Sequence, residues 1–141
     1  MTRNGPDDAT RKGSSDVEAI EGLLAFAQTR PRWSGSAALK SASEAIAKSR
    51  ALALAEKSPG ERTALLARCL RTTAKLLMKR GRATEALPLA QEAVALTRSL
   101  GGGALVTSLV CLASAQEALH RYSDAAATIA EADQVPPPDP G

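Results

Sequence analysis

Two segments of this chain, 39 residues apart, share one pattern of residues, and this repetition constrains the fold more than any other feature. GRATEALPLAQEA begins at Gly81, and HRYSDAAATIAEA begins at His120. Each has a basic residue in second place, an acidic residue and an alanine in the fifth and sixth places, and Glu-Ala at its end. A chain that repeats such a segment is expected to repeat a structural unit.

The repetition extends into the residues that precede each segment. A shift of 39 residues aligns seven pairs of identical residues: Leu66 and Leu105, Leu70 and Leu109, Ala74 and Ala113, Arg82 and Arg121, Ala86 and Ala125, Glu92 and Glu131, Ala93 and Ala132. These pairs span two stretches of helical periodicity, so the unit is predicted to be a helical hairpin. Its small alanines would let the two helices cross closely, and Ala86 and Ala125 are predicted to be buried there.

The composition favours helices along the whole chain. Its 141 residues are rich in Ala and Leu and include one Trp, one Tyr and one Phe, which leaves little for a β-sandwich or barrel to pack with. The length suits a single domain. Periodicity and breakers predict an all-α domain over 16–135, with helices near 16–30, 36–57, 58–80, 83–99, 104–119 and 123–134. The polar residues 1–15 and the Pro-rich residues 136–141 are predicted to be disordered or extended tails.

Several residues are candidates for helix ends. Ser58 opens a Ser-x-x-Glu capping box with Glu61, and Thr84 and Ser123 are candidate N-caps for two later helices. Gly81 is expected to adopt the left-handed conformation that ends a helix. In the second repeat His120 takes the place of this glycine.

The alternation of antiparallel helices, with alanines at the crossing and a basic turn, resembles the tetratricopeptide repeat over residues 59–135. The spacing of 39 differs from the usual 34 of that family, and the surplus falls in LGGG at 100–103. The resemblance implies a short right-handed α-solenoid. Because two repeats rarely suffice, residues 16–57 are expected to form a third, degenerate hairpin. The alternative is a compact bundle whose first helix folds back over the rest.

Residues for catalysis or metal binding are scarce. His120 is the single histidine and lies in a predicted turn, and Cys69 and Cys111 lie within apolar stretches without a redox or zinc motif, where they are expected to be buried. We therefore expect a protein that is not an enzyme, without a metal or cofactor. The uncharged run 99–116 contains glycines and serines and is interpreted as a buried helix, not a membrane span. The cytoplasm is the expected location.

Basic residues concentrate between Ser58 and Arg82. This stretch contains seven basic residues and one acidic residue, whereas the whole chain has a net charge of only +3. On a helical projection, four of the basic residues fall within about 80° of one another, opposite the apolar residues, and form a basic stripe: Arg68, Arg71, Lys75 and Lys79. This stripe could also be a solvated outer face.

In tetratricopeptide repeats the first helix of each hairpin lines the concave surface, so the resemblance places the stripe in a groove, with Val110, Ser114 and Ala118 as its floor. Such a groove would bind an acidic or amphipathic peptide, as in a protein-interaction module that acts as an adaptor or scaffold. A homo-oligomer is also possible, because the last helix exposes alanines at one end of the array. The alternative is a nucleic-acid-binding protein that uses the basic helix, but three aromatic residues offer little surface on which bases could stack.

Overall fold

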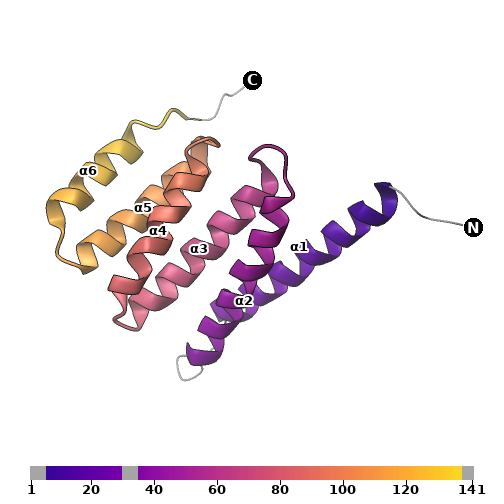
Figure 1. The fold of residues 1–141 in the computed structure, drawn as a ribbon. Helices are drawn as coiled ribbons and strands as arrows, with labels where there is room; N and C mark the ends of the chain where they lie inside the picture. The colour runs from indigo at the N-terminus through magenta and orange to yellow at the C-terminus, as the bar shows by residue number, and fades with distance from the viewer. Residues whose placement is uncertain (1–5, 30–34, 138–141) are drawn as a thin grey trace, which may run out of the picture.

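The computed structural model describes residues 6–29 and 35–137, and all regular secondary structure within them is α-helical. This confirms the all-α prediction. The described residues form six helices, which are labelled in Figure 1. Their bounds are Pro6–Thr29 for α1, Gly35–Leu54 for α2, Glu61–Lys79 for α3, Ala83–Thr97 for α4, Gly102–Ala118 for α5 and Tyr122–Asp133 for α6.

The helices form an open row in the order of the sequence (Figure 1). Each helix packs against the next one along the chain, and the odd-numbered helices also contact one another, α1 with α3 and α3 with α5. Within the described residues, α1 and α6 lie at opposite ends and make no contact. The first helix therefore does not fold back over the rest, which excludes the compact bundle considered as an alternative.

The first helix begins ten residues earlier than the sequence predicted. The expected start was Asp16, but α1 begins at Pro6, so residues 6–15 belong to a helix and not to a tail. Proline is well tolerated in a first turn because its missing N–H would have no helical partner there. Residues 1–5, 30–34 and 138–141 lie outside the described part of the chain, and with them a part of each predicted tail.

The turns that close α3 and α5 have the same hydrogen bonds. After α3, the N–H of Gly81 donates to the Met78 carbonyl (3.0 Å) and the N–H of Arg82 donates to the Leu77 carbonyl (2.9 Å). The equivalent bonds after α5 join His120 to Glu117 (2.9 Å) and Arg121 to Gln116 (2.8 Å). Both turns are Schellman motifs, which require a left-handed residue.

Gly81 and His120 supply that left-handed residue, with φ angles of 74° and 61°. The prediction for Gly81 is confirmed, and the histidine occupies the same conformation as the glycine it replaces. A non-glycine residue is uncommon at positive φ, but histidine is one of the types enriched there. The Nδ1 atom of His120 lies 2.7 Å from the Tyr122 hydroxyl, a contact that helps to fix the side chain over the turn.

The predicted caps Thr84 and Ser123 are wrong. The helices α4 and α6 begin before these residues, at Ala83 and Tyr122, and neither N-cap makes a side-chain capping hydrogen bond. The reason is the preceding Schellman turn, which leads directly into the next helix. Its last residue already serves as the N-cap, because the carbonyl of Arg82 accepts from the N–H of Ala86 and the carbonyl of Arg121 accepts from the N–H of Ala125.

Ser58 is also not a cap, because a carboxylate from the preceding loop takes that role. The helix α3 begins at Glu61, and Glu56 accepts hydrogen bonds of 3.1 Å from the N–H groups of Gly60, Arg62 and Thr63, and one of 2.7 Å from the Thr63 hydroxyl. Partial burial acts to raise the pKa of Glu56, but these hydrogen bonds outweigh it and hold the pKa below its ordinary value.

The core between the helices is built largely from alanine. Ala86 and Ala125, aligned by the repeat, are 0% and 2% exposed, so the prediction that both are buried is confirmed. Ala86 and Ala90 of α4 pack with Ala74 and Leu77 of α3 and with α5 residues in one cluster. Two helices can approach this closely only where the side chains between them are small, so the alanines fix the spacing of the row.

Replacing Ala86 by leucine tests this spacing. The larger side chain has no space at the crossing of α3 and α4, so Ala86→Leu should lower the free energy of unfolding by about 1 to 3 kcal/mol. Ala95→Leu is the matched control, because Ala95 lies on the same helix but is exposed. Denaturant unfolding followed by circular dichroism measures both variants. Equal unfolding midpoints for the two would show that Ala86 is not confined.

The Glu56 carboxylate should make the stability depend on pH. The pKa of Glu56 is lowered in the folded state, so its carboxylate stabilises the fold at pH values above the ordinary carboxyl pKa. This stabilisation is lost as the pH falls through the folded-state pKa. At neutral pH, Glu56→Gln should destabilise the fold by about 0.5 to 2 kcal/mol, as for a lost cap. In strong acid, where both states of the wild type are protonated, the difference should disappear.

Glu61→Gln is the control for this experiment. Glu61 is exposed in the first turn of the same helix, so its loss removes a favourable charge near the helix dipole but none of the hydrogen bonds that Glu56 makes. In urea unfolding, Glu56→Gln should therefore lower the free energy of unfolding more than Glu61→Gln does. If both variants lower it equally, Glu56 acts only through its charge near the helix end.

Candidate functional site

The basic stripe lies on the narrow part of α3 that its neighbours leave uncovered. This helix contacts α1, α2, α4 and α5, and ten of its residues are buried. Arg68 and Arg71 are partly buried, and Lys75 and Lys79 are exposed. The stripe therefore reaches solvent along α3, but its two arginines are engaged with other helices.

Arg68 forms an ion pair with Glu21 of α1. Both side chains are nearly half exposed, so water screens the pair and its contribution to stability is small. The pair nevertheless neutralises one of the four stripe charges. Glu21 thus ties the beginning of the stripe to the first helix of the row.

Arg71 reaches in the opposite direction, toward α5. Its Nη1 atom donates a 3.0 Å hydrogen bond to the Ser108 hydroxyl oxygen, and this hydroxyl donates in turn to the Ala104 carbonyl (2.9 Å). Ser108 is fully buried. Burial lowers the pKa of Arg71, although the group remains charged at neutral pH because an arginine pKa starts so high. A cation that is already partly dehydrated loses less hydration when an anion binds to it.

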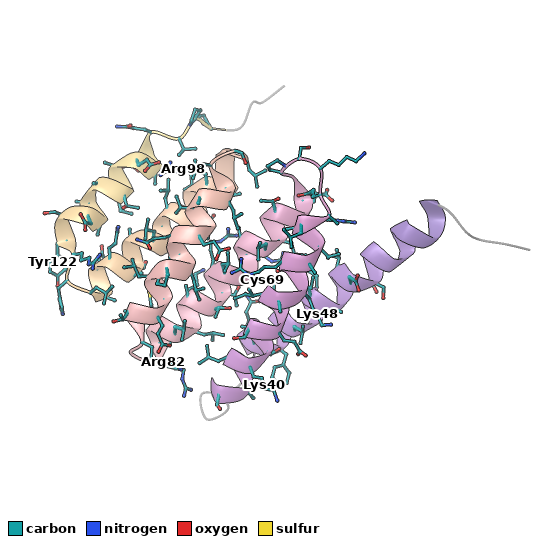
Figure 2. The ribbon with its side chains drawn as sticks, in the orientation of Figure 1. Lys40, Lys48, Cys69, Arg82, Arg98 and Tyr122 are labelled. Atoms are coloured by element: carbon teal, nitrogen blue, oxygen red, sulfur yellow. The ribbon has the colours of Figure 1, made fainter. Side chains whose placement is uncertain are left out.

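Lys75 and Lys79 continue the stripe as exposed cations. Lys75 lies near the Cys111 thiol of α5: burial raises the pKa of this thiol, and the charges of Lys75 and Arg71 oppose that rise. Burial likewise raises the pKa of Cys69. Both cysteines are free and buried, as expected for small apolar side chains (Cys69 is labelled in Figure 2). Neither has the lowered pKa of a reactive thiol.

Three residues predicted as a groove floor lie on consecutive turns of α5. Val110 is 45% exposed, and Ser114 and Ala118 are exposed as well. The Ser114 hydroxyl donates to the Val110 carbonyl (3.1 Å), so its hydrogen is directed along the helix. The helices α3 and α5 are in contact, and Arg71 bonds across them to Ser108. The candidate residues on these two helices are here called the α3/α5 surface: Arg68, Arg71, Lys75, Lys79, Val110, Ser114 and Ala118.

The sequence did not indicate Glu21 or Ser108 as parts of this surface. Glu21 is one of several acidic residues on α1, and Ser108 belongs to the apolar half of α5. Their importance comes from contacts between helices far apart in the sequence. A pattern of residues along one helix defines a face but does not say which side chain of another helix reaches it.

Comparisons with known proteins assign neither a family nor a function to this chain. No protein-family model, no curated protein and no solved structure matches this chain. A separate search of the described residues finds no helix that is both long and apolar enough to cross a membrane.

The hydrogen bond between Arg71 and Ser108 can be tested through stability. Ser108→Ala removes the partner of a partly buried cation and should lower the free energy of unfolding by about 1.5 to 3 kcal/mol, the range for hydrogen bonds to charged groups. Ser114→Ala is the matched control on the exposed side of α5 and should change it by less than about 0.5 kcal/mol. Urea unfolding measures the free energy of unfolding of both variants. A Ser108→Ala protein as stable as the control would show that Arg71 is not held by this bond.

Proposed function

We propose that this chain is a protein-interaction module of tetratricopeptide-like repeats, an adaptor or scaffold without enzymatic activity. The α3/α5 surface would bind an acidic or amphipathic peptide segment of a partner protein. The observation that carries the proposal is that α3 presents two exposed lysines and one partly dehydrated arginine and contacts α5, which exposes Val110. This arrangement offers positive charge and apolar surface within one binding site.

The packing of the helices supports the repeat arrangement. Two successive hairpins close with the same turn, bury equivalent alanines and begin their second helices at equivalent residues. The odd-numbered helices contact one another. In the tetratricopeptide family the corresponding helices line the concave surface, and by that analogy the α3/α5 surface would be part of a groove.

The charges and the apolar residues would contribute differently to binding. Exposed lysines gain only about 0 to 1 kcal/mol each from ion pairs, so they would mainly accelerate association and make it sensitive to salt. Arg71 is held in place by Ser108 and is partly dehydrated, so it resembles the arginines that dominate protein interfaces. Val110 and Ala118 would accept a small apolar side chain of the peptide.

Nucleic acid is a less suitable ligand for this surface. Arg68 is neutralised by Glu21, so three of the four stripe cations remain to contact phosphates. Nucleic-acid affinity depends on the number of phosphates that basic residues neutralise. An acidic peptide needs fewer charges and can use the apolar residues of α5.

Binding of a defined peptide tests the proposal. The probe is a synthetic peptide of alternating Glu and Leu with a fluorescent label, and the readout is fluorescence anisotropy at low and high salt. Wild-type protein should bind it, and binding should weaken with salt. The double variant Lys75→Glu and Lys79→Glu should lose affinity by up to about 25-fold, which corresponds to two exposed ion pairs. Arg71 is left unchanged because its replacement would also affect stability.

The control variant is Lys48→Glu with Lys57→Glu, which makes the same change of charge at exposed positions away from the α3/α5 surface (Lys48 is labelled in Figure 2). It should bind the peptide nearly as well as the wild type. If the two double variants bind the peptide equally well, affinity depends only on the net charge of the protein and not on the α3/α5 surface. A wild type that binds a labelled single-stranded oligonucleotide more tightly than the peptide would favour the nucleic-acid function instead.

A further inference from the structure

The two ends of the helical row expose complementary features. At the first end, α1 and α2 form an open, mostly apolar groove of about 490 Å³. It is lined by Ala19, Gly22, Leu23 and Phe26 of α1 and by Ala37, Lys40, Ser41 and Glu44 of α2. Ile20 and Leu24 of α1 are buried in a cluster with Leu65 and Cys69 of α3 and do not line the groove, whereas Leu23 contributes to both. Most of the groove lining on α1 is therefore distinct from the residues that pack on α3.

At the other end, α6 exposes a face that is covered in the preceding repeat. Under the shift of 39 residues, Leu87 and Ala90 of α4 correspond to Ala126 and Ile129 of α6. Ala90 is fully buried, and Leu87 packs in the same cluster, which α5 covers with Cys111 and Ala115. Ile129, in contrast, is 38% exposed. In the preceding repeat, the first helix of the following hairpin, α5, therefore covers the face of α4 that corresponds to this face of α6.

The helices α2 and α6 carry net charges of opposite sign, although α1 itself contains five acidic and two basic residues. The helix α6 contains three acidic residues and no basic one, whereas α2 contains three basic residues and one acidic residue. Figure 2 shows Lys40 on α2 well apart from Tyr122 at the start of α6. Within the chain, successive even-numbered helices are already joined by ion pairs, Arg50 of α2 with Glu92 of α4 and Arg98, directly after α4, with Glu131 of α6.

We propose that the chain associates head to tail with a second copy, whose α1 and α2 cover the Ile129 face of α6. The first helix of the second copy would lie against α6 as α5 lies against α4. The Ile129 side chain would enter the apolar groove, and Lys40 on the rim of the groove would lie near the acidic residues of α6. This contact joins two different surfaces, so it leaves a free groove at one end and a free α6 at the other. It is separate from the α3/α5 surface.

Sedimentation at increasing chain concentration tests the association. The mean mass of the wild type should rise continuously with concentration, because each added copy exposes new ends. Ile129→Asp removes the apolar contact on α6, and Gly22→Trp fills the groove. A side chain at Gly22 meets no atom within 4 Å of its first carbon, so this substitution should not disturb the monomer. Each variant alone should sediment as a monomer with unchanged helicity.

Mixing the two variants distinguishes a head-to-tail contact from a symmetric one. Gly22→Trp keeps an intact α6 and Ile129→Asp keeps an intact groove, so the mixture should form dimers that do not grow further. Leu54→Asp is the control, since Leu54 is 87% exposed outside both ends and its replacement should leave association unchanged. A wild type that stays monomeric at millimolar concentration overturns the proposal. So does association of Gly22→Trp alone, or a mixture that remains monomeric.

Discussion

The close approach of helices at buried alanines is the constraint on which the rest of this structure depends. Ala86, Ala90 and Ala93 of α4 are each fully buried. Small side chains at these positions let neighbouring helices pack closely, and few large side chains are needed to fill the space between them. Such packing buries less apolar area per helix than a core of leucine and phenylalanine does. A single hairpin would therefore be unstable alone, and each one depends on its neighbours in the row.

Polar side chains connect the hairpins, and they shape the candidate site at the same time. Arg68 pairs with Glu21 across α1 and α3, and Arg71 bonds to Ser108 across α3 and α5. The stripe that seemed uniform in the sequence consists of two cations with a structural role and two that are exposed. Arg71 is half-buried and bonded to Ser108. In the proposed function, stability and recognition are linked at this residue.

The repeat made a large part of the fold predictable from the sequence, because equivalent positions meet equivalent surroundings. It located the buried alanines Ala86 and Ala125 and the left-handed Gly81, and it aligned His120 with that glycine. The start of α1 was not predictable, since the polar residues before Asp16 show no apolar periodicity. The caps failed for a local reason: a Schellman turn or the distant Glu56 had already satisfied the helix end. Partners such as Ser108 depend on three-dimensional contacts that no linear pattern encodes.

Amide hydrogen exchange resolved by residue can show whether the helices form an open row held by contacts between neighbours. In dilute solution, where copies do not cover each other's ends, α3 and α4 should exchange most slowly, because they lie in the middle of the row and pack more extensively on each other than any other pair of helices does. The terminal helices α1 and α6 should exchange fastest. Protection of α1 and α6 equal to that of α3 would contradict the account, because it would mean that the two ends are covered within a single closed bundle.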